Sequence, residues 1–321
     1  MLTTKINFVP MDFGGCGSYR IKYPGFACYN KAKVNISTPM MYNSYGQEFI
    51  YTQRVCNKDV FNTLMPLKDK GIKFVIDYDD CLWRELPNYN KCDIHYEDNY
   101  KGMKEYLDKF AYKVTCTNEF LKKDLSEFVN EDKIIVMPNC LDYTRWRFNY
   151  IKPSDKISFF YAGSPTHYDG KNYGDFSSGL VHYLQNKTIY GMGHLPEFIK
   201  GKVLTNWVDI DFYPSVFYQC AVNSKFIIAP LADNYFNKCK SDLKYIESCA
   251  VGRVCLVTDF PDCPYSAVAH EYQKIPLNST ATAINYIVER ANEHYDEIIE
   301  HQYKVLNERW LDANKYLQIF Q

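Results

Sequence analysis

The chain has 321 residues, 46% of them hydrophobic and 23% charged, which is enough for about two globular domains with cores of their own. Its 37 Lys and Arg against 38 Asp and Glu give a net charge of −1, which excludes a protein that binds nucleic acid through overall positive charge but leaves a local basic groove open. The N-terminus lacks the pattern of a signal peptide, and no apolar run is long enough to cross a bilayer. We therefore expect a cytoplasmic protein that does not insert into membranes.

In the first half of the chain, short apolar runs rich in β-branched residues alternate with helix-like stretches. The apolar runs predict strands at 6–9, 33–37, 49–52, 73–76, 113–116 and 134–137. The stretches between them predict helices at 59–70, 98–110 and 118–129. The polar and aromatic segment 139–155 then predicts a connection between two domains.

The alternation starts again after this connection. Strands are predicted at 158–161, 188–190, 203–204, 226–229 and 254–257, and helices at 176–185, 214–220, 242–250, 281–295 and 296–319. Alternating strands and helices are typical of parallel α/β sheets. The sequence therefore predicts two Rossmann-like domains, 1–150 and 151–295, that face a central cleft, with a terminal helix from 296. Ligands of such sheets bind beyond the carboxyl ends of the strands.

A glycine-rich segment, Gly14-Gly15-Cys16-Gly17, follows the first predicted strand. Glycines there allow backbone N–H groups to approach a phosphate, and a helix N-terminus would add a positive dipole. The segment matches neither G-x-G-x-x-G nor a Walker A loop, so a tight turn without a ligand remains an equal interpretation.

Three carboxylates, Asp77, Asp79 and Asp80, follow the strand 73–76. Carboxylates this close raise one another's pKa unless a cation or hydrogen-bond donors compensate. One interpretation is a Mg²⁺-dependent phosphatase of the haloacid-dehalogenase type that uses Asp77 and Asp79. Another is a general base or an anchor for an acceptor hydroxyl, and a third is helix capping.

A second glycine turn opens the second half, where Gly163 and Ser164 follow a strand and His167 comes three residues later. Its backbone N–H groups can also meet a phosphate, and His167 and Asp169 are expected to point into the cleft. A purely structural histidine is the alternative.

The segment 228–247 has the most specific pattern. A strand ends at Pro230, and Ser241 or Asp242 is a credible N-cap for the helix that follows. Lys240 at that helix start predicts an anion site, and Lys244 and Glu247 share a helix face. The spacing suits a nucleoside diphosphate, with Glu247 accepting hydrogen bonds from ribose hydroxyls. The alternative is an amphipathic helix with a surface Lys–Glu pair.

The run from Pro230 to Glu247, followed by Gly252 and the strand 254–257, resembles the donor site of GT-B glycosyltransferases. The two glycine turns and the Trp310-Leu311 segment resemble that family too. The resemblance implies the GT-B fold, with a C-terminal helix, 296–321, that crosses back to the N-terminal domain. It also implies a nucleotide-sugar donor, most simply UDP-linked, and neither metal nor cofactor. Many retaining members have a glutamate where this chain has Cys239, so the paired-glutamate role does not transfer.

The resemblance also assigns residues. Glu247 would bind the ribose, and Lys240 and Ser241 the diphosphate. The remaining donor-site candidates are Gly15, Gly17, Arg20, Gly163, Ser164 and Lys244. Asp77, Asp79 and Asp80 would face the acceptor, with Asp79 or Asp80 activating its hydroxyl and His167 as a further catalytic candidate.

The acceptor predicted first is a 5-hydroxymethylpyrimidine in double-stranded DNA. The composition is similar to that of phage proteins, and large phages attach sugars to such bases, so the compartment would then be the host cytoplasm. In the stretch 141–147, Arg145 and Arg147 would hold phosphates while aromatic rings stack a flipped base. The same stretch is equally consistent with a packed interdomain hinge. Two alternatives remain: an acceptor that is a bacterial glycan or lipid-linked sugar, and a nucleotide-binding protein without enzymatic activity.

Overall fold

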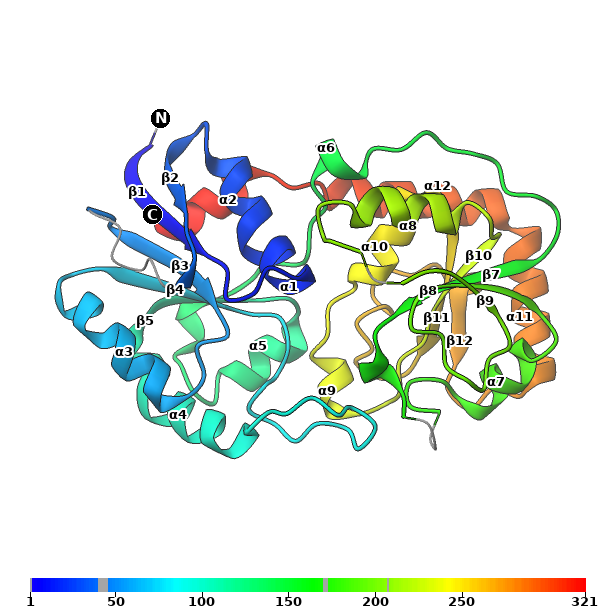
Figure 1. Cartoon of the computed structure of the whole chain (residues 1–321), viewed down its shortest axis with the longest axis horizontal. Coiled ribbons are helices and arrows are strands. Elements are labelled where there is room, and N and C mark those ends of the chain that lie inside the picture. The colour runs from blue at the N-terminus through cyan, green and yellow to red at the C-terminus, as the bar shows by residue number, and fades with distance from the viewer. Residues whose placement is uncertain (1, 40–45, 170–172, 207) are drawn as a thin grey trace.

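The computed structural model describes residues 2–39, 46–169, 173–206 and 208–321. It has two lobes side by side, each built on a six-stranded parallel sheet with helices packed against it (Figure 1). In the described parts of the chain, no helix is both long and apolar enough to span a membrane.

The first sheet has the strand order β2-β1-β3-β4-β5-β6. One face packs on α3, α4 and α5, and the other on α2 and the C-terminal α13. With both faces covered, every residue of β3 is buried, as expected for a central parallel strand. The strands are β1 Leu2–Val9, β2 Ala32–Ile36, β3 Phe49–Gln53, β4 Lys73–Tyr78, β5 Ala111–Cys116 and β6 Ile134–Val136; the helices are α1 Gly15–Gly17, a π-helical turn Ser18–Lys22, α2 Tyr23–Cys28, α3 Lys58–Asp69, α4 Tyr96–Phe110 and α5 Glu119–Leu125.

The second sheet has the order β12-β11-β10-β7-β8-β9. Helices α8 and α10 cover one face, and α7 and α11 cover the other. The strands are β7 Ser158–Gly163, β8 Thr188–Gly193, β9 Lys202–Thr205, β10 Phe226–Ala229, β11 Val254–Asp259 and β12 Lys274–Pro276; the helices are α7 Ser178–Leu184, α8 Tyr213–Ala221, α9 Tyr235–Lys238, α10 Leu243–Ala250, α11 Ala281–Glu293 and α12 Tyr295–Glu308. The last helix of the chain, α13 Ala313–Leu317, packs in the first lobe.

Every strand predicted from the apolar runs is present, so the α/β prediction is confirmed. The elements that were missed are short, and among them are β12, α1, the π-helical turn 18–22, α2, α6 (Tyr143–Trp146) and α9. Segments of three to six residues carry too little periodicity to separate a strand or helix from a loop.

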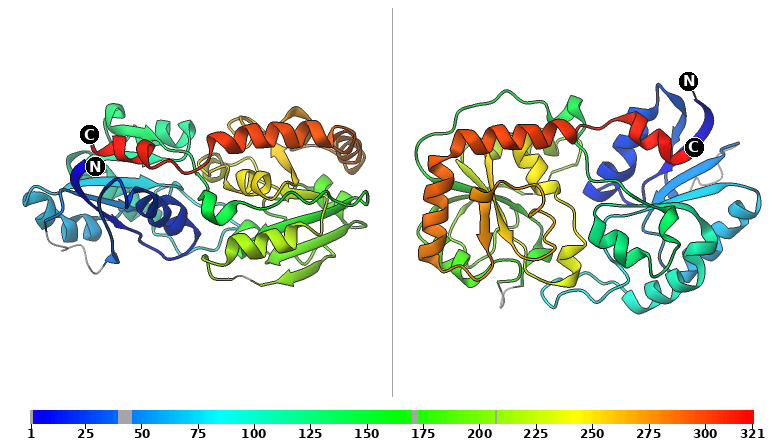
Figure 2. Two further views of the ribbon diagram at one scale, coloured as in Figure 1. Left: turned by 90° about the horizontal axis from the view of Figure 1, so that it is seen from above. Right: turned by 180° about the vertical axis from the view of Figure 1, so that it is seen from behind.

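The prediction of one terminal helix over 296–319 is wrong. The helix α12 ends at Glu308 beside α10 in the second lobe, and α13 packs against α2 in the first. Between them the chain crosses the molecule in a non-helical segment, seen from above in Figure 2. Leu141, on the other interdomain crossing, donates its N–H to Arg309 O at 2.9 Å and accepts from Leu311 N at 3.0 Å. The Arg309 carbonyl and the Leu311 N–H are therefore bonded to Leu141, and they cannot form the hydrogen bonds that would continue the helix.

Candidate functional site

A cavity of about 610 Å³ lies between the two domains and is large enough for a nucleotide-sized ligand. The first domain lines it with the segments that follow β1, β4 and β6, and the second with those that follow β7, β9, β10 and β11. We call this space the interdomain cavity. Among the residues that line it are Phe13, Gly15, Cys16, Tyr19, Arg20, Asp79, Asp80, Asn139, Ser164, His167, Asp209, Tyr213, Lys240, Ser241, Lys244 and Glu247.

Glu247 on α10 is 2% exposed and lines this cavity, so the alternative of a surface Lys–Glu pair is wrong. Its two carboxylate oxygens accept hydrogen bonds from hydroxyl groups: Tyr19 of the first domain at 2.9 Å and Tyr213 at 3.2 Å. Burial raises the pKa of Glu247 to about 7, against the lowering effect of these donors and of Lys244. The position suits the recognition of ligand hydroxyls, because two hydroxyls already occupy it.

Positive charge gathers at the start of α10. The Lys240 ammonium lies 3.5 Å from Asp80 Oδ1, and the Lys244 ammonium lies over the ring of Tyr161. Burial lowers the pKa of Lys244 to about 8. Ser241 accepts a hydrogen bond from the side-chain amide of Asn139 at 2.8 Å. Two ammonium groups beside a helix start favour an anionic ligand here.

Asp242 occupies the N-cap position of α10, but its side chain does not cap the helix. Its carboxylate instead binds Arg309 at 2.6 Å, which ties α10 to the chain crossing.

Asp79 and Asp80 both reach the cavity but differ in their surroundings. Arg54 binds both oxygens of Asp79, at 2.8 and 2.7 Å, and holds the pKa of Asp79 down at about 2 despite burial. The pKa of Asp80 is raised, chiefly by burial, while Lys240 opposes the rise. Arg54 has a φ of 57°, in the left-handed region that non-glycine residues rarely adopt. Of the two aspartates, Asp80 is the more basic, because its pKa is raised while that of Asp79 is lowered.

Asp77 does not take part in the cavity, which corrects its predicted acceptor role. It is fully buried and paired with Arg20, whose Nη2 and Nε lie 2.6 and 2.9 Å from the carboxylate oxygens. Tyr51 and Thr115 also donate to it. The phosphatase interpretation fails for the same reason, since Asp77 and Asp79 are each neutralised by a different arginine and share no open cation position. The described residues contain no group of three or more His, Cys, Asp or Glu side chains arranged to hold a metal.

His167 lines the cavity and pairs with Asp175, its Nδ1 lying 2.6 Å from Asp175 Oδ2. Burial, and then the charge of Lys244, lower the pKa of His167 to about 4, although Asp175 opposes this. Asp169, which was expected to point into the cleft, lies outside the cavity lining and within 3.6 Å of Lys91.

The predicted glycines have different surroundings. Gly15 lines the cavity, and a Cβ there would meet nothing within 4 Å. At Gly17 a Cβ would lie 1.9 Å from Asp12 O, and at Gly163 it would lie 2.0 Å from the Tyr161 hydroxyl. Gly17 and Gly163 are therefore required for packing, and neither lines the cavity, whereas Ser164 does.

Arg20 lines the cavity, but its guanidinium is already occupied. Besides Asp77 it donates to Asn139 Oδ1 at 2.9 Å, and Asn139 in turn donates to Ser241 of the second domain. The structure thus gives Arg20 an organising position within the cavity wall.

Neither Arg145 nor Arg147 lines the cavity, which corrects their predicted acceptor role. Arg145 binds Asp211 at 3.0 Å and stacks over Tyr23, and Arg147 lies over the Tyr143 ring. Trp146 is fully buried against α8 and cannot stack on a base. The alternative interpretation, a packed interdomain segment, describes this stretch.

Several residues of the cavity wall or its support were missed by sequence reasoning: Tyr19, Arg54, Asn139, Asp175 and Tyr213. Tyr19 stands at the end of the first glycine turn, but no role was assigned to it, and the other four stand in no motif. Cys239, at the position of the family's second glutamate, is fully buried in the core cluster that contains Cys81 of the first domain.

No protein-family model and no curated protein sequence matches the chain. Solved structures do match it in fold. Sucrose-phosphate synthase from Thermosynechococcus elongatus aligns with a TM-score of 0.69 and 12% identity over 99% of this chain and 98% of its own. HepE of Anabaena in complex with UDP has a TM-score of 0.64, 11% identity and 98% coverage of both chains. BGT of T4 phage in complex with UDP and Mn²⁺ has a TM-score of 0.57 and 14% identity, over 98% of this chain and 97% of its own. The chain has the GT-B fold, as its resemblance implied.

Proposed function

We propose that this GT-B-fold chain is a glycosyltransferase that transfers a sugar from a UDP-linked donor to an acceptor hydroxyl. The observation that carries the proposal is the arrangement on α10, where a buried carboxylate, Glu247, already accepts two hydroxyls one turn beyond Lys244. Structures of the same fold were solved with UDP, and one, HepE, also with UDP-glucose.

In the proposed complex the ribose hydroxyls replace the Tyr19 hydroxyl at Glu247. The diphosphate lies at Lys240, Lys244 and Ser241, close to the backbone of Gly15 and Ser164. Charge develops on the diphosphate as the bond to the anomeric carbon breaks, and the two ammonium groups stabilise it. We expect transfer that continues in EDTA, because these cations belong to the protein.

We propose Asp80 as the general base. It takes the proton of the acceptor hydroxyl while the acceptor oxygen bonds to the anomeric carbon and the diphosphate departs. Its raised pKa makes it a stronger base than Asp79, whose oxygens are both held by Arg54. His167, neutral at pH 7, lies across the same cavity.

As acceptor we propose a 5-hydroxymethylpyrimidine of double-stranded DNA, presented as a flipped base. Phe13 supports this choice, because it lines the cavity yet is 65% exposed, and an exposed ring there is suited to stacking a planar base.

A duplex that contains hydroxymethylcytosine should gain a fixed mass per modified base with UDP-glucose. Transfer only to a bacterial glycan or lipid-linked sugar would replace the DNA acceptor. Donor binding without transfer to any acceptor would favour a non-enzymatic nucleotide-binding protein.

The donor site is tested by Glu247→Gln, which keeps the size of the side chain but removes its charge. We expect UDP-glucose to bind about 10- to 100-fold more weakly, because charge-assisted hydrogen bonds to the ribose are lost. Isothermal titration calorimetry measures the change. Glu289→Gln, an exposed change on α11, is the control that should bind like the wild type.

The pH dependence gives a second test of the same carboxylate. Since only the ionised form accepts two hydroxyls, wild-type affinity should rise as pH increases through about 7, the pKa of Glu247. UDP-glucose is the ligand to use, because both of its phosphates are esterified and do not titrate in this range. Glu247→Gln should lose this rise, whereas both proteins should bind more weakly as pH increases through about 8, where Lys244 loses its charge. Equal affinity of the folded variant and the wild type would contradict the donor assignment.

A further inference from the structure

Tyr89 reaches from the first domain into a polar cluster of the second. It belongs to the segment between β4 and α4, and its hydroxyl donates to Asp175 Oδ1 at 2.6 Å. The same hydroxyl accepts hydrogen bonds from the amides of Asn234 and Asn237, at 2.9 and 3.1 Å. Tyr89 is therefore the first domain's contribution to the surroundings of Asp175.

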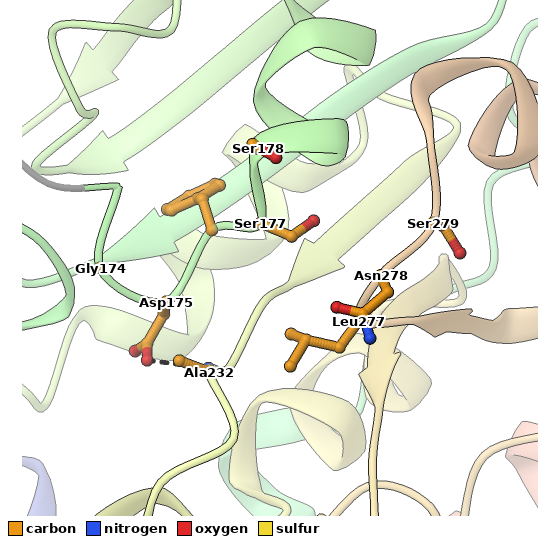
Figure 3. A pocket seen from close by; sticks show the side chains of 9 residues that line it. Gly174, Asp175, Ser177, Ser178, Ala232, Leu277, Asn278 and Ser279 are labelled. Atoms are coloured by element: carbon orange, nitrogen blue, oxygen red, sulfur yellow. Dashed lines mark hydrogen bonds between the residues drawn. The ribbon is translucent and has the colours of Figure 1, made fainter.

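Asp175 is 1% exposed, and both of its oxygens are engaged. Oδ1 accepts from Tyr89, from Asn237 at 2.6 Å and from the Ala232 N–H at 3.1 Å. Oδ2 lies 2.6 Å from His167 Nδ1. Figure 3 shows Asp175 bonded to Ala232 beside a smaller cavity of about 340 Å³. With four partners, this carboxylate has a fixed position.

The bond to Asp175 determines how His167 faces the interdomain cavity. A proton on Nδ1, directed at the carboxylate, leaves Nε2 as an acceptor. Burial, Lys244 and Lys240 favour the neutral ring, and Asp175 favours the charged one. The donors on Asp175 weaken its pull on a second proton, because each withdraws electron density from the carboxylate.

We propose that Tyr89 is a positioning residue that holds His167 neutral and oriented, so that the state of this histidine depends on the contact between the domains. Three donors on Asp175 Oδ1 share this effect, but only Tyr89 comes from the other domain. Loss of its hydroxyl leaves Asp175 a stronger acceptor, and the imidazolium becomes easier to form. This inference rests on the proposed glycosyltransferase function, in which His167 lines the site of reaction. The protonation of His167 can nevertheless be measured without any sugar transfer.

The test is Tyr89→Phe, followed by NMR titration of the His167 ring, assigned by its loss in His167→Asn. The wild-type ring should stay neutral down to about pH 5, and the variant's midpoint should lie about one pH unit higher than the wild type's. Tyr235→Phe is the matched control. Tyr235 also bridges the domains through its hydroxyl, to Asp124, but does not contact Asp175, so the titration should not move.

Sugar transfer supplies a second readout. In Tyr89→Phe we expect kcat at pH 7 to stay close to that of the wild type, because the ring is still neutral there. Below about pH 5 we expect kcat to fall by up to tenfold relative to the wild type, with the donor KM within twofold. Asp80 contributes to the acid limb in both proteins, so the difference between the two profiles reports His167. An unmoved midpoint in folded Tyr89→Phe, or an equal shift in Tyr235→Phe, would overturn the proposal. If the protein transfers no sugar but the midpoint moves as expected, the proposed function fails and the role of Tyr89 stands.

Discussion

Replacing Asp80 with asparagine should slow sugar transfer by about 10²- to 10⁴-fold while UDP-glucose still binds within about threefold of the wild type. The asparagine keeps the shape of the side chain but cannot accept the acceptor's proton. Asp80 lines the cavity 3.5 Å from Lys240, and its pKa is raised by burial. Single-turnover rates and calorimetric affinities separate the two effects. Wild-type activity should fall as pH drops through the pKa of Asp80.

Two other carboxylates serve as comparisons for this result. Asp209→Asn removes a charge from the opposite rim of the same cavity and should change turnover little. Asp79→Asn removes the main partner of Arg54, whose guanidinium also lies 3.6 Å from Asp80. It should act less on the chemical step than Asp80→Asn, because the pKa of Asp79 is already held near 2. The base would be Asp79 if that variant alone lost turnover with normal donor affinity. Equal turnover in Asp80→Asn and Asp209→Asn would rule out Asp80 as the general base.

Asp77→Asn should lower the free energy of unfolding by about 3–5 kcal/mol, since it leaves a fully buried arginine charge without its partner. Arg20 and Asp77 are 1% and 0% exposed and lie 2.6 Å apart. Arg20 also donates a hydrogen bond to Asn139, which lines the cavity. Loss of the Arg20–Asp77 pair should therefore also weaken the packing of the cavity wall. Urea unfolding followed by circular dichroism measures the loss.

The control for this stability prediction is Asp211→Asn. Asp211 pairs with Lys22 at 3.1 Å on the surface, where such pairs contribute about 0–1 kcal/mol. The double variant Arg20→Met/Asp77→Leu removes both charges and should be more stable than Asp77→Asn alone. If the urea midpoint of Asp77→Asn changed as little as that of Asp211→Asn, the buried Arg20–Asp77 pair would not stabilise the fold.

The parallel sheets and the start of α10 could be predicted because they depend on neighbours in the chain. A strand buried on both faces, such as β10 Phe226–Ala229, is a short apolar run wherever it lies. Lys244 and Glu247 share the cavity because helical spacing brings residues three to four apart onto one face, and Lys240 lies in the turn just before that helix. Local periodicity therefore predicted the fold class and the residues that stand in motifs.

The charge partners could not be predicted, because they come from segments far apart in the chain. Asp77 and Asp79 look equivalent in sequence. In the structure, Arg20, 57 residues away, pairs with Asp77 in the core, whereas Asp79 pairs with Arg54 and still lines the cavity. Tyr19 meets Glu247 across 228 residues. At the break after α12, Leu141 of the other interdomain crossing bonds to the backbone of Arg309 and Leu311. Whether a carboxylate becomes a base, a ligand anchor or a buried structural partner depends on burial and on the nearest opposite charge, and both are set only when the domains pack.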